Sequence, residues 1–429
     1  MVVELISVGT ELLLGNIVNT NANYLSKKCA ELGFSLYFQI TVGDNEERFC
    51  EVLKSSLLRS DIVILTGGLG PTQDDMTKEA VAKIFERRLV MDEPSKERIS
   101  SYFSFLLKSN PDRIAMNLGL DSVTQNNWKQ ALKIEDSIVV DNDNGTAPGY
   151  ILEADYMDKK KRVILLPGPP SEMVPMFEHH IFPYLNKLQN KVFVSKMVKI
   201  CGIGESKAET QILDLIEAQT NPTIAPYAKS GEVHFRVTAS ADSEEEAQTM
   251  LEPVIHELFH RFDINIYTTE EEETLEQVVV KTLTSKKLTV TCAESCTGGL
   301  LTGRLVNVPG VSSVLKESFI TYSNEAKIKY LGVKEDTLRE FGAVSERTAA
   351  EMAVGAAERT GSDTAIAITG IAGPDGGTEE KPVGLVYISC YVKGEVTVRK
   401  FHMKGNREKI REQSVIYALD LLRRNVTKL

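Results

Sequence analysis

The chain has 429 residues, of which 42% are hydrophobic and 25% charged, and its net charge is −11 at pH 7. This length exceeds one ordinary core and predicts two or three domains. The acidic balance argues against a nucleic-acid-binding protein, because phosphate contacts need an excess of lysine and arginine. No apolar run is long enough to span a membrane, and six scattered cysteines indicate a reducing compartment, so we expect a soluble, cytoplasmic protein.

Strand and helix patterns alternate over the first third of the chain. Apolar runs predict strands at residues 2–8, 35–42 and 61–66, and helical spacing predicts helices at 19–32 and 46–58. This alternation predicts a mostly parallel sheet with helices on both faces. Ligands of such sheets lie beyond the carboxyl ends of the strands.

A glycine-rich loop, TGGLGPTQDD, follows the third strand at residues 66–75 and leads into a helix predicted at 76–88. Its glycines allow backbone amides to approach a phosphate, and its carboxylates suit a divalent cation that bridges to phosphate oxygens. The alternative is that Asp74 and Asp75 only cap the helix. The predicted substrate contacts here are Gly67, Gly68, Gly70 and Thr72, and the predicted metal ligands are Glu11, Asp44, Asp74 and Asp75.

These residues resemble the molybdopterin-binding fold of molybdenum-cofactor biosynthesis enzymes. The matching motifs are GTELLLG at 9–15, the glycine-rich loop, GTAPG at 145–149 and LPGPPSEM at 166–173. The resemblance implies a three-layer α/β domain in which Gly145 and Thr146 also contact substrate. The sequence departs from the family near Ser137, where KIEDSIVV replaces an expected proline-glycine-alanine turn. Amphipathic helices are predicted between the motifs, at 95–108 and 111–118.

The middle of the chain resembles a small KH-like α+β module. A helix at 171–188 precedes a strand–helix–strand–strand–helix order at 191–201, 202–218, 223–228, 232–239 and 244–259. The loop Gly202–Glu205 lacks the basic character of an RNA-binding KH loop, so a spacer or dimerisation role is favoured. Residues 264–273 read as a polar linker. The predicted domains are therefore 1–170, 171–262 and 263–429.

The last third contains a second α/β domain around the stretch TCAESCTGG, residues 291–299. An apolar strand pattern ends here and a helical pattern begins after Gly299, which places Ser295 at a tight turn. The glycines allow close approach of a substrate, and the helix N-terminus is expected to offer free N–H groups to an anion or oxyanion. Helices are predicted at 274–285, 324–331, 345–359 and 407–424, and strands at 364–369, 385–391 and 395–402.

A serine nucleophile needs a base, and His402 is the only histidine of this domain. Lys327 is the candidate base, because burial can depress the pKa of an amine. Nearby, Tyr322 is suited to hold the lysine or the substrate, Thr369 to orient the acyl group, and Arg407 to pair with a phosphate. Alternatives stay open: Ser295 as a helix cap, Lys327 as a solvated residue, and Cys296 as a rival nucleophile. A zinc site at Cys292 and Cys296 lacks a second ligand pair.

The motifs AESCTGG, TYSNEAK, GAVSE and TGIAGPDGG resemble the nicotinamide-nucleotide amidohydrolases, or NMN deamidases, over residues 275–422. With the first domain, the whole chain resembles full-length CinA-type (competence/damage-inducible) proteins. The resemblance implies hydrolysis of nicotinamide mononucleotide to the acid plus ammonia, with Ser295 and Lys327 as the catalytic pair and no cofactor. It also implies substrate or supporting contacts from Tyr322, Thr369, Ser312, Cys296, Thr297, Gly298, Gly299 and Arg407.

For the first domain the same resemblance implies an ADP-ribose pyrophosphatase that needs Mg²⁺, Mn²⁺ or Co²⁺, and for the whole chain a homodimer. Two alternatives belong to other classes of protein. The first domain binds a pterin or nucleotide without turnover, or the whole protein is a non-enzymatic competence-associated factor. The acidic charge disfavours the second of these.

Overall fold

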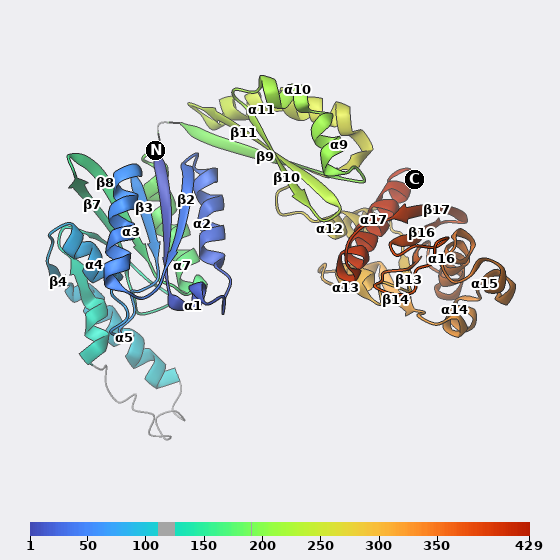
Figure 1. Ribbon diagram of the computed structural model, residues 1–429, viewed down its shortest axis with the longest axis horizontal. Helices are drawn as coiled ribbons and strands as arrows, with labels where there is room; N and C mark the ends of the chain where they lie inside the picture. Colours follow the sequence, from blue (N-terminus) through green and yellow to red (C-terminus); the bar gives the residue numbers. More distant parts are fainter. Residues whose placement is uncertain (110–124, 190) are drawn as a thin grey trace. The chain divides into compact units, whose positions relative to one another are not determined.

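The computed structural model describes residues 1–109, 125–189 and 191–429, so the helix predicted at 111–118 lies outside the described residues. The chain divides into two compact units (Figure 1). The first consists of Met1–Phe193 with Ala241–Ser243, and the second of Val194–Ser240 with Glu244–Leu429. No helix of the described chain is both long and apolar enough to cross a membrane.

The first unit is built on a six-stranded sheet in the order β2-β1-β3-β8-β7-β6. The first four strands are parallel, and β7 and β6 are antiparallel to their neighbours, which confirms the predicted mostly parallel sheet. The strands are β1 (Val2–Val8), β2 (Ser35–Val42), β3 (Ile62–Thr66), β6 (Ile138–Val140), β7 (Gly149–Tyr156) and β8 (Lys159–Leu166), and a separate ribbon pairs β4 (Leu89–Met91) with β5 (Leu132–Ile134).

Helices cover both faces of this sheet and make a three-layer domain (Figure 1). Leu5 and Ile64 face one layer of helices, while their neighbours Ile6 and Val63 face the other, because successive side chains of a strand alternate. The first layer contains α2 (Thr20–Glu31), α7 (Pro170–Met176) and α8 (Phe182–Asn186), and the second contains α3 (Glu46–Arg59) and α4 (Thr77–Ile84). The unit also contains α1 (Thr10–Leu13), α5 (Glu93–Ser109) and η1 (Gln125–Ala131).

The single helix predicted at 171–188 is wrong in detail. It consists of α7, a π-helical turn η2 (Phe177–Ile181) and α8. Pro175 lies inside α7 and Pro183 near the start of α8, and each lacks the N–H that a continuous helix needs. The segment packs into the core of the first unit through Met173, Phe177 and other apolar side chains. The first domain therefore extends beyond the predicted boundary at residue 170.

The middle module contains a four-stranded sheet in the order β10-β11-β9-β12. Its strands are β9 (Val192–Cys201), β10 (Thr223–Lys229), β11 (Glu232–Ala241) and β12 (Ile266–Thr268), and its helices are α9 (Glu205–Thr210), α10 (Leu213–Ala218), α11 (Glu244–Phe262) and the short η3 (Asp263–Asn265). The predicted linker at 264–273 is wrong in its first half, because β12 is buried and pairs with β9. The glutamate run that follows β12 made the composition of residues 264–273 strongly polar, so this short strand was not recognised.

The second unit joins this module closely to the C-terminal domain. Arg424 donates a hydrogen bond to the Cys201 carbonyl at 2.9 Å, at the start of the Gly202–Glu205 loop. A side chain on Gly202 would meet Arg424 at 2.7 Å, so this loop packs on the C-terminal helix. The region predicted as one helix after this loop is two, α9 and α10, separated by Gln211 and Ile212.

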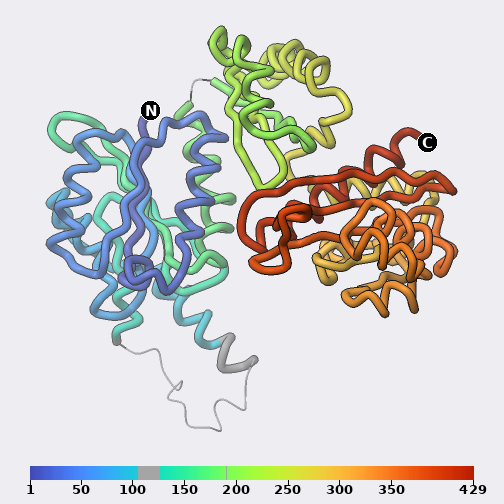
Figure 2. Tube along the Cα trace, turned by 45° about the vertical axis from the view of Figure 1, so that its right-hand side comes forward, coloured from blue at the N-terminus to red at the C-terminus, as the bar shows by residue number. Residues whose placement is uncertain are grey.

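The C-terminal domain has a five-stranded sheet in the order β14-β13-β15-β16-β17. Strands β14, β13 and β15 are parallel, and Figure 2 shows β16 and β17 as the predicted antiparallel hairpin. One face is covered by α12, α13 and α17, and the other by α14 and α16. The elements are α12 (Leu275–Ser285), β13 (Val290–Glu294), α13 (Leu300–Val306), η4 (Val311–Ser313), β14 (Leu315–Ile320), α14 (Asn324–Leu331), α15 (Glu335–Phe341), α16 (Glu346–Thr360), β15 (Thr364–Gly370), β16 (Leu385–Val392), β17 (Glu395–His402) and α17 (Arg407–Thr427).

Candidate active site

Ser295 lies directly after β13, at the carboxyl edge of the C-terminal sheet. Its N–H donates to the Ile368 carbonyl at 3.0 Å, which ties the turn to the neighbouring strand β15. Gly298 and Gly299 then adopt positive φ angles of 57° and 96°, which side chains rarely tolerate, and α13 begins at Leu300. The strand–turn–helix predicted from the sequence is therefore confirmed, and it holds the Ser295 hydroxyl at a sharp turn.

Lys327 meets this hydroxyl from the first turn of α14. Its Nζ lies 3.1 Å from Ser295 Oγ, although the two residues are 32 positions apart in the chain. The Ser323 side chain caps α14 by accepting a hydrogen bond from the Ala326 N–H at 3.1 Å, which sets where this helix begins. The side chain of Lys327 is only 1% exposed. The predicted serine–lysine pair is thus formed within one chain.

The amine of Lys327 has two further acceptors, the carbonyls of Thr321 at 2.8 Å and of Tyr322 at 3.3 Å. Burial lowers its pKa to about 8, opposed by electrostatic interactions with Cys296 and Glu325, which raise it. An ammonium group donates to all three oxygens, whereas a neutral amine donates to the two carbonyls and keeps one lone pair. That lone pair would face Ser295 Oγ, which is the arrangement a general base requires.

Glu294 occupies the helix N-terminus that the sequence suggested for substrate. Its carboxylate is fully buried and accepts hydrogen bonds from the N–H groups of Gly299, Leu301 and Thr302, at 2.8–3.1 Å. It also accepts from the Thr302 hydroxyl at 2.7 Å. The expectation that these amides are free for an anion is therefore wrong, because the carboxylate before the nucleophile already compensates them.

The turn itself keeps other donors available. Within the described chain, the backbone N–H groups of Cys296 and Thr297 donate no hydrogen bond to another residue. Arg411 binds the carbonyls of the same two residues, at 3.0 and 2.8 Å, and so fixes the peptide planes of the turn. The buried hydroxyl of Thr297 has no hydrogen-bond partner among the described residues. Burial raises the pKa of the Cys296 thiol to about 11, which disfavours the thiolate and hence Cys296 as the nucleophile.

Tyr322 and Arg407 form the exposed rim of the site. Arg407 donates to the Tyr322 hydroxyl at 3.1 Å and to the Gly373 carbonyl at 2.8 Å, which fixes its guanidinium group. Tyr322 is 62% exposed, so its ring is available to a ligand. Thr369 is fully buried at the end of β15 and donates its hydroxyl proton to the Ala343 carbonyl at 2.7 Å. Its contact therefore orients the loop before α16, on the same sheet edge as Ser295.

Ser312 is the one predicted contact that the fold places elsewhere. It lies in η4, before β14, where Leu315 pairs with Val290 at the start of β13. Ser295 follows the opposite end of β13, roughly 16 Å farther along the strand. The structure therefore does not bring Ser312 to the Ser295–Lys327 pair within one chain.

The first unit gathers its predicted residues around one cavity of about 480 Å³ at the carboxyl ends of β1 and β3. Gly67 has a φ of 97°, and a Cβ there would lie 2.3 Å from the Val8 carbonyl oxygen, so the loop depends on this glycine. Gly145 borders an adjoining cavity and touches Glu172, whose carboxyl pKa is raised by burial. The cavity walls include Gly67, Gly68, Gly70, Thr72, Thr146 and Glu172.

All four predicted metal ligands line this cavity, but they do not form a ligand set. Asp44 accepts hydrogen bonds from the N–H and hydroxyl of Thr10, at 3.0 and 2.8 Å. Asp75 accepts the same pair from Thr72, at 2.9 and 2.5 Å. Within residues 1–109, 125–189 and 191–429, no three acidic, histidine or cysteine side chains lie close enough to hold a metal ion. Glu11 and Asp74, the other two predicted ligands, and Glu172 also line the cavity, but the residues present do not fit a preformed metal centre.

Three site residues were missed from the sequence: Arg411, which binds the Cys296 and Thr297 carbonyls, Lys129 and Glu294. Lys129 donates to the carbonyls of Thr72, at 2.9 Å, and of Asp75, and so holds the glycine-rich loop from outside. Lys129 is more than 50 residues from the loop in the chain, so no local sequence motif indicated this contact. Glu294, in contrast, stood visibly as a carboxylate inside an apolar strand. A buried charge needs partners, and this requirement could have identified it.

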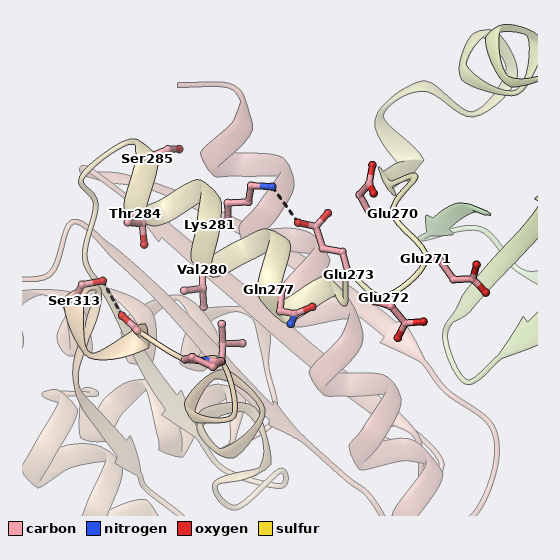
Figure 3. Close-up of a pocket in the computed structure, with 13 residues that line it drawn as sticks. Glu270, Glu271, Glu272, Glu273, Gln277, Val280, Lys281, Thr284, Ser285 and Ser313 are labelled. Carbon is pink, nitrogen blue, oxygen red and sulfur yellow. Dashed lines mark hydrogen bonds and ion pairs between the residues drawn. The ribbon is translucent and has the colours of Figure 1, made fainter. Parts of the chain in front are cut away.

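A larger cavity, of about 1210 Å³, lies in the second unit but away from the catalytic pair. It is lined by the glutamate run 270–273, one side of α12 and the loop before η4 (Figure 3). Glu273 pairs with Lys281 at 3.3 Å, whereas Glu270, Glu271 and Glu272 project away from α12. Among its lining residues, which all belong to the described part of the chain, no lysine amine contacts a hydroxyl group as Lys327 contacts Ser295.

Comparisons with known proteins agree with this architecture. Three family models match in succession: a probable molybdopterin binding domain over residues 4–187, the KH domain of damage-inducible protein CinA over 195–268, and the CinA C-terminal domain over 272–426. A CinA-like protein of Dictyoglomus turgidum is 52% identical over 99% of both chains. A putative competence-damage inducible protein of Clostridium beijerinckii is 50% identical over 100% of both.

Among solved structures, a competence/damage inducible protein of Agrobacterium tumefaciens matches 34% of this chain and 91% of its own, with 44% identity and a TM-score of 0.34. The three successive domains and the full-length relatives give one result: the chain belongs to the CinA family, with a molybdopterin-binding domain, a KH-like middle module and a CinA C-terminal α/β domain.

Proposed function

We propose that the C-terminal domain hydrolyses the carboxamide of nicotinamide mononucleotide to the carboxylate and ammonia. The observation that supports this most is the 3.1 Å contact between a buried lysine amine and Ser295 Oγ. Lys78, Lys161 and Lys199 are also buried, but they donate to backbone carbonyls alone. Lys327 differs from them because its amine is also directed at a hydroxyl group. The choice of substrate comes from the resemblance to the nicotinamide-nucleotide amidohydrolases.

The proposed reaction has two halves. Neutral Lys327 takes the Ser295 proton as Oγ attacks the carboxamide carbon, and the resulting ammonium then protonates the departing amine, which leaves as ammonia. The nicotinoyl group is now an ester on Ser295. In the second half Lys327 takes a proton from water, hydroxide attacks the ester carbonyl, and Ser295 recovers its proton. One water is consumed, and one carboxylate, one ammonia and one proton are produced, the last two combining as ammonium at neutral pH.

Groups around the pair have supporting roles in this proposal. The N–H groups of Cys296 and Thr297, held by Arg411 through their carbonyls, would donate to the oxyanion of the tetrahedral intermediate. Arg407 would pair with the substrate phosphate, since its guanidinium group is already oriented by Tyr322. No cofactor takes part in these steps.

Ammonia release from nicotinamide mononucleotide tests this proposal. We expect Ser295→Ala and Lys327→Ala to lose ammonia release, while Lys329→Ala, an exposed lysine of the same helix, keeps the wild-type rate. Normal release by both site variants would refute the assignment. Thermal melting of all three proteins separates lost chemistry from lost folding.

For the first unit we propose hydrolysis of the pyrophosphate bond of ADP-ribose. Support comes from the glycine-rich loop at the carboxyl ends of parallel strands, in a cavity large enough for part of a nucleotide. Incubation of the purified protein with ADP-ribose and Mg²⁺, Mn²⁺ or Co²⁺, followed by chromatography, tests turnover and metal dependence. Unchanged turnover in chelator would exclude the metal requirement, and binding without products would favour the alternative of a pterin- or nucleotide-binding module.

Asp75→Asn tests the glycine-rich loop of the same unit, and we expect loss of ADP-ribose turnover. Lys54→Ala, a change on the exposed side of α3, is the control. We also propose a homodimer, which light scattering checks through a mass twice that of the chain. A mobility shift with DNA that persists at moderate salt would instead favour a nucleic-acid-associated competence factor, against the net charge of −11.

A further inference from the structure

The large cavity beside α12 in the second unit takes no part in the reactions proposed above, and we call it the α12 groove (Figure 3). Its volume of about 1210 Å³ exceeds the roughly 300–1000 Å³ of a typical small-molecule site. Three segments form its walls: the loop at 270–273, the part of α12 at 277–285 and the loop at 308–313. The α12 groove therefore has room for a short stretch of another polypeptide.

The walls of the α12 groove combine apolar surface with an acidic rim. Val280 on α12 and Val308 in the following loop are largely buried, and Pro309 extends this apolar surface toward solvent. The glutamates at 270–273 lie at the other side, where the chain arrives from the middle module (Figure 3). A surface of this kind is complementary to a segment that carries both apolar and basic side chains.

Two of the four rim carboxylates have no partner of opposite charge. Glu271 pairs with Arg236 at 2.6 Å, and Glu273 pairs with Lys281 at 3.3 Å. The side chains of Glu270 and Glu272 form no ion pair or hydrogen bond with any residue that the structure describes. The rim therefore keeps two uncompensated negative charges beside the apolar wall.

The acidic loop is held in place by contacts that leave these two carboxylates free. The buried amine of Lys199 donates to the carbonyls of Glu271 and Glu273, at 2.5 and 2.7 Å. The Thr268 hydroxyl donates to the Glu273 carboxylate at 2.5 Å and accepts from the Glu270 N–H at 3.1 Å. Like charges that are held close together repel, and a cationic partner would relieve this repulsion. The loop is thus preorganised to present its charge.

We propose that the α12 groove is the docking site for a basic, partly apolar segment of a partner protein. Lysine or arginine side chains of the partner pair with Glu270 and Glu272, and its apolar side chains cover Val280, Val308 and Pro309. A second copy of this chain is a poorer occupant, because its net charge of −11 is repelled by the rim. The proposal does not depend on either proposed activity.

Binding of short labelled peptides to the full-length protein, measured by fluorescence anisotropy at about 0.1 M salt, tests the proposal. One peptide alternates lysine with leucine, a second alternates lysine with glycine, and a third alternates glutamate with leucine. We expect the lysine–leucine peptide to bind at least about tenfold more tightly than the lysine–glycine peptide, because burial of even one leucine side chain is worth that factor. The glutamate–leucine peptide should not bind.

A matched pair of double variants separates the groove from general attraction to an acidic protein. Glu270→Gln with Glu272→Gln removes the two free rim charges, and we expect about fivefold weaker binding of the lysine–leucine peptide. Glu340→Gln with Glu358→Gln changes the net charge equally, but on exposed positions of α15 and α16, across the sheet from α12. This control should bind as wild-type protein does, and thermal melting checks that all variants are folded.

A third variant tests the wall of α12. Thr284→Lys introduces a cation at an exposed wall position in the last turn of the helix, where a positive charge is compatible with folding. We expect this variant also to bind the lysine–leucine peptide several-fold more weakly.

Four results would overturn the proposal. Absence of binding of the lysine–leucine peptide by wild-type protein, or equal binding of the lysine–glycine peptide, would show that the apolar wall docks no such segment. An equal loss of affinity in both double variants would show that only the net charge attracts the peptide. Self-association that is lost in the rim variant, measured by light scattering, would show that the occupant is a second copy of this chain.

Discussion

Deamidation should depend on pH through the protonation of Lys327. The amine must be neutral to accept the Ser295 proton, and burial lowers its pKa from 10.5 to about 8. One unit below such a pKa, at pH 7, roughly one tenth of the enzyme has the neutral amine. An exposed lysine would be neutral in only about one molecule in 3000. Burial therefore increases the active population at pH 7 about 300-fold, which corresponds to about 3.4 kcal/mol.

The perturbation that tests this reasoning is Lys327→Arg. A guanidinium group stays protonated throughout the accessible pH range, so the variant keeps the charge and loses the base. We expect kcat/KM for ammonia release to fall about 10²–10⁴-fold, the usual contribution of a general base. In wild-type protein kcat/KM should rise about tenfold per pH unit up to pH 7.5 and level off above about pH 8.5. Lys329→Arg, on the exposed side of the same helix, should reproduce the wild-type profile.

Stability provides an independent measurement of the same pKa. Between about pH 8 and 10.5 the unfolded chain binds a proton at Lys327 that the folded chain does not, so the free energy of unfolding rises with pH in this window. Relative to Lys327→Met, wild-type protein should gain up to about 3 kcal/mol across it. A flat kcat/KM between pH 6 and 9, with no such stability difference, would refute the neutral-lysine mechanism.

Three further predictions follow from individual contacts. Glu294→Leu should lower the free energy of unfolding of the second unit by about 3 kcal/mol or more, because three amides and a hydroxyl lose their buried acceptor. Chemical denaturation measures this loss, and a value below about 1 kcal/mol would contradict the capping role. Arg407→Ala should raise KM for nicotinamide mononucleotide about tenfold with a smaller change in kcat, and an unchanged KM in steady-state kinetics would remove it from phosphate binding. Gly67→Ala should lower the melting temperature and abolish ADP-ribose binding, because the new Cβ would lie 2.3 Å from the Val8 carbonyl oxygen. A variant that is stable and binds ADP-ribose normally would contradict the requirement for glycine at this position.

Much of the fold could be predicted from the sequence, because the elements around the sites carry strong local patterns. The strand IVILT at 62–66 is apolar on both faces and is buried on both, and Ser323 and Ser345 cap their helices at the predicted starts. The strand β12 could not be found in this way. Three residues carry too little pattern, and their place in the sheet depends on pairing with β9, which is distant in the chain.

The site residues could be predicted only where a local sequence motif lies at a strand end that the sheet brings close to another such end. Ser295 and Lys327 meet because adjacent parallel strands bring the ends of β13 and β14 to one edge of the sheet. Their exact partners could not be predicted, since the carbonyls of Thr321 and Tyr322 are set by the path of the chain between β14 and α14. The hydrogen bonds from the N-terminus of α13 to Glu294 also depend on the tertiary structure. A buried carboxylate needs hydrogen-bond donors, and these amides are the donors near it.

The most direct test of the serine–lysine mechanism is to find the covalent intermediate. Wild-type protein mixed with nicotinamide mononucleotide, quenched with acid within the turnover time and digested, should yield a peptide that carries the nicotinoyl mononucleotide as an ester on Ser295. Fragmentation in the mass spectrometer distinguishes this residue from the neighbouring Cys296, and the adduct should be absent from Lys327→Ala. An adduct on Cys296, or ammonia release by a Ser295→Ala variant, would contradict the mechanism.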